Sequence, residues 1–324
     1  AILLELNPEG GYVVGFEWGI NVIRGVLLNL NAEIIESEIR DVTSYEFDYF
    51  SKSTLEIIKK FRANHNEDNR FFGVGIGIHG LVNSEEGISL YAPHFSWENI
   101  KVKKSLEEKI DLPVFIGNDV NVMAQAEKWF GQGKQVDDFI FIETGIGIGA
   151  SIVIDRKLYR GKDWSAGEFG HMIVNINGPE CVCGNYGCLN AMLSLNRLVG
   201  EYNPKLDYKL DYKKLKQEWQ KLINNAQQGD DNAIKVILRA GKYLGIGISN
   251  LVNLLNPEMI IIGGDLAEAE ELIFPVIRQE VKRKSLEVPN KNLKLTTASF
   301  GDKTGAIGAA VGILQKLFKL EEKK

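Results

Sequence analysis

The sequence predicts an α/β protein with two lobes, and three observations indicate this. Apolar segments typical of buried strands alternate along the chain with segments of helical periodicity. A strand, a glycine turn and a second strand open the chain, and the same pattern returns at residues 137–161, as expected where a second lobe begins. The length of 324 residues exceeds what one hydrophobic core usually holds and suits two.

The expected first lobe begins after a turn cluster at residues 7–11. Its helices are expected where apolar side chains are spaced three and four apart, at residues 51–64 and 102–110, and a further helix is expected after this lobe's last strand, at residues 121–131. Its strands are expected at residues 12–19, 22–30, 32–40, 70–80 and 112–119.

Helices dominate the expected second lobe. Helical patterns cover residues 213–229 and 230–255, and the second ends where Asn256-Pro257 stops it. Residues 258–273 indicate a strand, a glycine turn and a helix, and residues 294–299 a last strand. The closing helix, at residues 302–318, is rich in closely spaced small residues.

The composition is that of an ordinary globular protein. The chain is 44% hydrophobic and 25% charged with a formal net charge of −5, so it offers no basic surface for nucleic acid, and we expect that this chain alone does not bind DNA. No apolar run approaches the ~20 residues of a membrane span, and no charged leader precedes an apolar core. We expect a soluble protein of the cytoplasm.

One short segment, residues 165–189, holds all three cysteines and one of the four histidines. Its His171, Cys181, Cys183 and Cys188 are the four ligands that a closed tetrahedral Zn²⁺ site needs, and the glycines between them permit tight turns. The alternative is three buried thiols and an unrelated histidine. A disulfide would leave one thiol unpaired. We predict a structural zinc ion.

The same segment carries a resemblance. Glu168-x-x-His171, followed by Cys-x-Cys-Gly-x-x-Gly-Cys-Leu, resembles the signature of the ROK family of sugar kinases and sugar-responsive repressors. The resemblance implies two α/β lobes of the ribonuclease-H-like, actin and hexokinase type, with an interlobe cleft and a zinc-binding loop. It implies an N-terminal lobe at residues 11–119 and 303–320, a C-terminal lobe at residues 120–302, and a linker at residues 1–10.

The resemblance also implies a sugar site. Asn118 and Asp119 match the family's Asn-Asp pair, whose aspartate is the catalytic base in the kinases. A carboxylate at this junction could instead simply cap the following helix. Further sugar-binding residues implied by matching positions are Gly80, His94, Glu168, His171 and Asn190. His79 and His94 depart from the family's pattern, and a histidine in a loop is often only solvated.

Two glycine-rich turns that hold nucleotide phosphates in the family's kinases are altered. The first turn here reads Glu17-Trp18-Gly19-Ile20-Asn21, where the kinases have Asp-x-Gly-Gly-Thr. The second, residues 143–149, begins with a glutamate and has an isoleucine in place of another glycine. A fixed carboxylate repels polyphosphate, and an added side chain blocks the approach of backbone amides. Gly263-Gly264 resembles the kinases' nucleotide-base turn, although packing alone would also favour it.

These features predict the sugar-sensing part of a ROK repressor, most like the xylose-responsive ones. The expected effector is a monosaccharide, xylose first, with glucose or an N-acetyl sugar also open. We expect a homodimer that reaches operator DNA through a winged helix-turn-helix module upstream of this chain. The alternative is an ATP- and Mg²⁺-dependent sugar kinase in which Asp119 is the base, of the glucokinase or N-acetylhexosamine kinase type.

Overall fold

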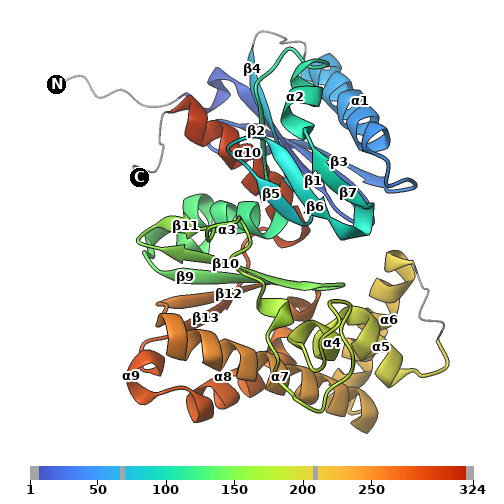
Figure 1. Ribbon diagram of the computed structural model, residues 1–324, viewed down its shortest axis with the longest axis vertical. Coiled ribbons are helices and arrows are strands. Elements are labelled where there is room, and N and C mark those ends of the chain that lie inside the picture. Colours follow the sequence, from blue (N-terminus) through green and yellow to red (C-terminus); the bar gives the residue numbers. More distant parts are fainter. Residues whose placement is uncertain (1–6, 66–69, 207–210, 319–324) are drawn as a thin grey trace. The chain divides into compact units, whose positions relative to one another are not determined.

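The computed structural model describes residues 7–65, 70–206 and 211–318 (Figure 1). Contacts divide the chain into two compact units. The first comprises Ala1–Gln135, Arg160–Ser165 and Ser299–Lys324, and the second comprises Val136–Tyr159 and Ala166–Ala298.

The first unit is built on a five-stranded sheet of order β3-β2-β1-β4-β8. The first three strands are antiparallel, and β4 and β8 join them in parallel. The strands are β1 (Tyr12–Trp18), β2 (Val22–Asn29), β3 (Ile34–Asp41), β4 (Phe71–Ile78) and β8 (Val114–Asn118).

Helices cover both faces of this sheet, because successive strand residues point to opposite sides. One core packs Val14 and Phe16 against α1 (Phe47–His65) and α2 (Val102–Glu107). The other packs Val13 against α3 (Asp119–Phe130) and α10 (Thr304–Leu317). Short 3₁₀ helices of this unit include Pro8–Gly10, Gln132–Gln135 and Gly301–Lys303.

A three-stranded sheet that sequence patterns did not predict lies between β4 and β8 in the chain. Its strands are β5 (Leu81–Asn83), β6 (Ile88–Ala92) and β7 (Trp97–Ile100), with the 3₁₀ helix Pro93–Phe95 before β7. Trp97 anchors it, since its ring lies 5.4 Å from that of Phe50 and 6.1 Å from that of Trp18.

The second unit repeats the sheet design, with order β11-β10-β9-β12-β13. Again three strands are antiparallel and two join in parallel. The strands are β9 (Phe139–Thr144), β10 (Ile148–Ile154), β11 (Lys157–Tyr159), β12 (Met259–Gly264) and β13 (Lys294–Thr297). The two-lobed α/β prediction and the repeated hairpin are therefore confirmed.

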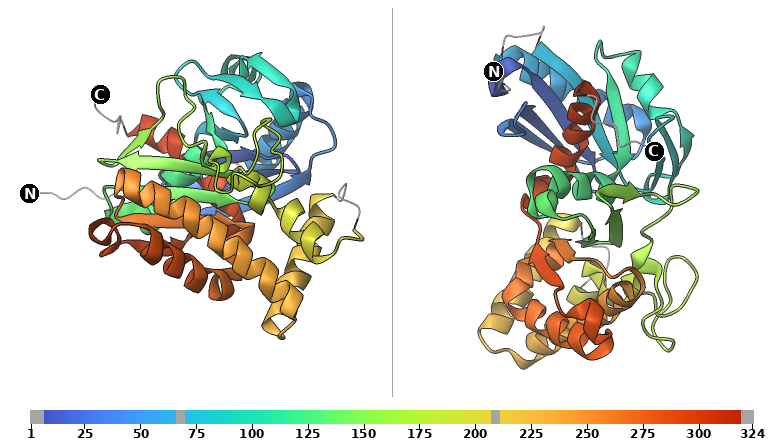
Figure 2. Two further views of the ribbon diagram at one scale, coloured as in Figure 1. Left: turned by 60° about the horizontal axis from the view of Figure 1, so that its bottom comes forward. Right: turned by 90° about the vertical axis from the view of Figure 1, so that its left-hand side faces the viewer.

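The second unit's helices form a large apolar core on this sheet. They are α4 (Leu189–Leu193), α5 (Leu195–Tyr202), α6 (Tyr212–Gln227), α7 (Asp231–Leu255), α8 (Glu270–Lys284) and α9 (Glu287–Asn290), with 3₁₀ helices at Phe169–His171 and Asp265–Ala269. Helices α7 and α8 run side by side (Figure 2). Among the described residues, no helix is long and apolar enough to cross a membrane.

The boundary between the units differs from the expected one at α3. The resemblance assigned residues after 119 to the C-terminal lobe, but α3 packs within the first unit against α10. The contact is close because a methyl group added at Gly308 would lie 1.8 Å from the carbonyl oxygen of Val122. The small residues of α10 thus let two helices touch along their backbones, and both belong to the first unit.

Candidate functional site

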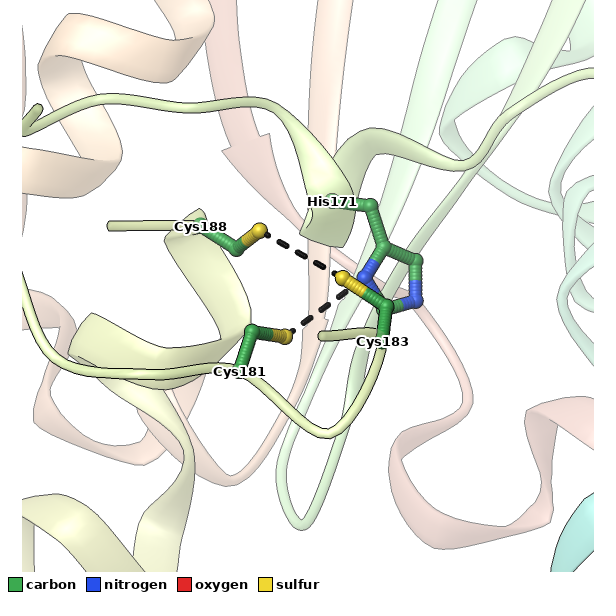
Figure 3. Close-up of side chains that lie close together, drawn as sticks. All are labelled: His171, Cys181, Cys183 and Cys188. Atoms are coloured by element: carbon green, nitrogen blue, oxygen red, sulfur yellow. Dashed lines mark hydrogen bonds between the residues drawn. The ribbon is translucent and has the colours of Figure 1, made fainter. Parts of the chain in front are cut away.

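The four predicted metal ligands come together in the second unit (Figure 3). Their ligand atoms all lie within 4.8 Å of one another. His171 Nδ1 is 3.6 Å from Cys181 Sγ, and Cys183 Sγ is 3.7 Å from Cys188 Sγ. A tetrahedral zinc with bonds of about 2.3 Å to sulfur and about 2.0 Å to nitrogen requires separations of about 3.8 and 3.5 Å. Geometry and donor set both fit a structural Zn²⁺.

Glycines shape the loop that carries these ligands. Gly187 has φ +70°, and a methyl group added there would lie 1.6 Å from the carbonyl oxygen of Asn175. Gly184 has φ +87° and turns the chain between Cys183 and Cys188, with its amide donating to the carbonyl oxygen of Cys181 (2.9 Å). The loop therefore depends on backbone conformations that favour glycine.

The thiols of the cluster are not equivalent. A hydrogen bond from the backbone of Asn185 lowers the pKa of the Cys183 thiol to about 6, whereas burial raises the pKa of the Cys188 thiol to about 12. Three thiolates in this space repel one another unless a cation lies between them. A divalent metal would therefore release protons as it binds.

Glu168 and Asn190 lie in the same unit as the histidine ligand. Because His171 uses Nδ1 toward the cluster, its Nε2 faces away, 3.9 Å from Glu168 Oε2. Both side chains are partly exposed. Asn190 lies in the first turn of α4, and its Oδ1 accepts from the amide of Ile148 (3.1 Å). Asn190 thus holds the start of β10 close to the metal loop.

The other predicted residues meet in the first unit, where β4 and β8 end. These strands pair in parallel with Ile78 opposite Asn118, so the residues that follow them share one edge of the sheet. Asn118 is the cap of α3, since its Oδ1 accepts from the amide of Asn121 (2.9 Å). Its Nδ2 donates to Asp119 Oδ1 and to the Gly80 carbonyl, both at 2.9 Å. Asn118, not Asp119, provides the helix cap and also holds its neighbour.

Sequence reasoning did not include His79 among the site residues, although it noted that His79 departs from the family's pattern. Its Nδ1 lies 3.2 Å from Asp119 Oδ2. Its ring also packs against that of the partly exposed His94, with centroids 5.0 Å apart. Burial, and to a lesser degree the charge of His79, lowers the pKa of His94. The position of His79 could have indicated this contact. His79 directly follows β4, Asp119 directly follows β8, and these two strands pair in parallel.

In the first unit, the carboxylate of Glu17, the first residue of the altered turn, rests against the start of α10. A methyl group added at Gly305 would lie 2.8 Å from Glu17 Oε2, so this side chain rests on the first turn of α10. Arg24 lies 3.5 Å from Glu17 and 3.5 Å from Asp302. Burial raises the pKa of Glu17 to about 7, against the opposing effect of Arg24, and the charge of Asp119 raises it further.

Carboxylates also face the altered turn of the second unit. A methyl group added at either Gly263 or Gly264 would lie 2.7 Å from an oxygen of Glu143, so this carboxylate covers the double glycine. One added at Gly145 would lie 2.9 Å from the buried Asp265. The space beside these glycines, which an approaching phosphate would need, is therefore lined by carboxylates, of which Asp265 is paired with Lys216.

Comparisons with known proteins agree with this picture. The ROK family model matches residues 13–316. The xylose repressor of Caldicellulosiruptor bescii is 31% identical, covering 99% of this chain and 82% of the repressor. The glucokinase of Thermotoga maritima is 32% identical over 75% of this chain and 80% of the enzyme.

A solved structure extends the likeness to three dimensions. The crystal structure of a ROK family transcriptional regulator, described as a homolog of the E. coli MLC protein, matches with a TM-score of 0.85 and 30% identity. The match covers 96% of this chain and 80% of the regulator. The zinc signature, the repeated sheets and these matches lead to one conclusion: the chain belongs to the ROK family.

Proposed function

We propose that this chain is the sugar-sensing part of a transcriptional repressor and that it does not phosphorylate the sugar. One observation carries the proposal: both phosphate turns are altered, by Ile20 and Asn21 in place of glycine and threonine in one unit and by the Glu143 carboxylate over the double glycine in the other, while the expected zinc and sugar residues are retained. The predicted sugar-binding residues can therefore bind a sugar in a protein whose phosphate turns exclude nucleotide.

Electrostatics give the reason why nucleotide is excluded. Two like charges 4 Å apart repel by about 4 kcal/mol at an effective dielectric constant of about 20. Catalysis of phosphoryl transfer consists almost entirely of positioning the phosphates and stabilising their charge. Asp119 can still accept a proton from a hydroxyl group, but a base without a positioned phosphoryl donor does not catalyse transfer.

The proposed effector is a monosaccharide, with xylose as the first candidate and glucose or an N-acetyl sugar next. Hydrogen-bond acceptors and donors suited to sugar hydroxyls are present in both units. In the first unit they are Asp119, held by Asn118, with the Gly80 backbone and His94. In the second they are Glu168, His171 Nε2 and Asn190. The proposal requires that substitutions in either group of residues weaken the binding of the same sugar.

The route from sugar to DNA is also part of the proposal. A winged helix-turn-helix module upstream of this chain would contact the operator, and a homodimer would place two such modules at half-sites about 34 Å apart or a multiple of it. The sugar can shift this arrangement only by the difference between its affinities for the two conformations. The relatives named as repressors support this proposal.

Titration calorimetry with D-xylose, D-glucose and N-acetylglucosamine, with and without ATP, tests the sugar site. We expect one of them to bind, and Asp119→Ala and Glu168→Ala each to weaken it at least tenfold. The matched controls Asp111→Ala and Glu180→Ala replace exposed carboxylates in the same two units and should bind normally. Failure of all three sugars to bind, or unchanged binding by Asp119→Ala, would refute the site.

A coupled assay tests the kinase alternative. Working kinases turn over roughly 1–100 times per second. We expect the protein to show no sugar-dependent ATP consumption in that range. Turnover at such a rate that disappears in Asp119→Asn would establish the kinase instead.

Light scattering and a spin label at Glu9→Cys test the signalling part. We expect a dimer whose label-to-label distance changes at saturating sugar. An unchanged distance distribution would leave sugar binding intact but refute this route to the DNA.

A further inference from the structure

Asp119 has its two carboxylate oxygens engaged by different parts of the first unit. Oδ1 accepts from Asn118 Nδ2 and from the amide of Val120, both at 2.9 Å. Oδ2 faces His79 Nδ1 at 3.2 Å. An ionised carboxylate can only accept, so the imidazole must carry its proton on Nδ1. This contact therefore defines the orientation of the carboxylate and places a proton on Nδ1 of the histidine.

The backbone holds His79 in place for this contact. Its neighbour Ile78 is paired with Asn118 in the parallel register of β4 and β8. On its other side, Gly80 has φ +100°, and a methyl group added there would lie 2.4 Å from the carbonyl oxygen of Tyr91 in β6. Because both sides of His79 are constrained, its imidazole is presented to Asp119 before any ligand arrives.

Acidic groups near Asp119 make the hydrogen bond from His79 Nδ1 important for this carboxylate. The Asp119 carboxylate is one of the causes that raise the pKa of Glu17. A hydrogen bond donated to a carboxylate offsets the repulsion from a neighbouring acidic group. The His94 ring packs against the His79 ring, with centroids 5.0 Å apart and the rings inclined at 63°, and is a second titratable group facing it.

We propose that His79 is a positioning residue for the effector: through Nδ1 it holds the Asp119 carboxylate in one orientation, so that a sugar hydroxyl meets a fixed acceptor. The inference rests on the proposed sugar site. It assigns a role to a histidine that departs from the family's pattern, and this role operates through Asp119.

Two substitutions separate the hydrogen bond from the bulk of the ring. In His79→Asn the amide nitrogen takes the place of Nδ1 and keeps a donor, whereas His79→Leu keeps volume and loses the donor. A hydrogen bond to a charged group is worth a factor of about ten or more in an equilibrium constant. We expect His79→Leu to weaken the tightest-binding of D-xylose, D-glucose and N-acetylglucosamine about tenfold or more, and His79→Asn to stay within about threefold of wild type.

The chain contains a matched control. His65 also faces a carboxylate in the first unit, with Nε2 3.1 Å from Glu36 Oε2, but on α1 and β3 rather than near Asp119. His65→Leu should leave the sugar affinity unchanged. Circular dichroism and zinc content of every variant identify any that fail to fold.

A measurement without sugar tests the pairing directly. Nitrogen chemical shifts of the histidine rings should show the Nδ1–H form for His79 in wild type and its loss in Asp119→Ala. Wild-type affinity in His79→Leu, weak binding in His79→Asn equal to that of His79→Leu, or a tautomer unaffected by Asp119→Ala would each overturn the inference. Absence of binding of all three sugars to wild type would instead remove the proposed function, and this inference with it.

Discussion

Glu17→Gln should make the protein more stable at neutral and alkaline pH. Glu17 lies in β1, with a side chain 13% exposed, and burial is the largest cause that raises its pKa from 4.5 to about 7. Arg24 opposes this effect, while the charges of Asp119 and Asp302 add to it. Glutamine resembles the protonated acid, so the substitution removes the cost of ionising this position.

The size of the effect follows from the pKa values. A difference of about 2.5 units, at 1.36 kcal/mol per unit, corresponds to about 3 kcal/mol. Because the folded state holds this proton more tightly than the unfolded state, wild type is favoured below pH 4.5 and loses that stability as the pH rises from 4.5 to about 7. Above pH 7, the free energy of unfolding of wild type should be lower than that of Glu17→Gln by the full difference of about 3 kcal/mol.

Thermal unfolding of zinc-saturated protein between pH 5.5 and 8 measures this. At pH 8 we expect Glu17→Gln to melt about 6–12 °C above wild type in the first unit, and this gap to narrow at pH 5.5. The buried Trp18 of the same strand provides a fluorescence signal. Glu86→Gln, at an exposed position, is the control and should follow wild type. Identical pH dependence in wild type and Glu17→Gln would refute the reasoning.

Three further predictions concern the metal loop and the catalytic alternative. Elemental analysis should find one Zn²⁺ per chain, lost in Cys188→Ser and released as the pH falls because the ligands must be deprotonated; little or no metal in wild type would end this assignment. Gly187→Ala should sharply reduce zinc retention in a chelator assay, because the added methyl group clashes with Asn175. In Gly184→Ala the added methyl group meets nothing within 4 Å, so this variant should lose only about 1 kcal/mol of stability. Equal losses of stability and zinc in the two variants would contradict the packing argument. Glu143→Gly alone should not create sugar-dependent ATP turnover, since Asp265 still faces the same turn; a working kinase from this one change would show that the turn was otherwise intact.

The sequence by itself determined those features that depend on near neighbours in the chain. The hairpins followed from the alternation of apolar residues, and β1 to β3 lie within a residue or two of the expected ranges. The metal cluster was also readable, because its ligands lie on one short loop whose glycines allow it to fold back. The unusual residues Ile20 and Glu143 were visible as departures from a known pattern, although the place where the Glu143 carboxylate rests was not.

Which distant residues meet depends on the tertiary structure. His79 and Asp119 are 40 residues apart, and their contact requires the parallel register of β4 and β8. Glu143 lies beside Gly263, 120 residues away, because β9 and β12 pair with these two residues opposite each other. Hydrophobic periodicity indicates which face of a strand is buried but not which strand becomes its partner. Strand pairing depends on the packing of the whole unit. The contact between His79 and Asp119, and that between Glu143 and Gly263, were therefore found only in the folded structure.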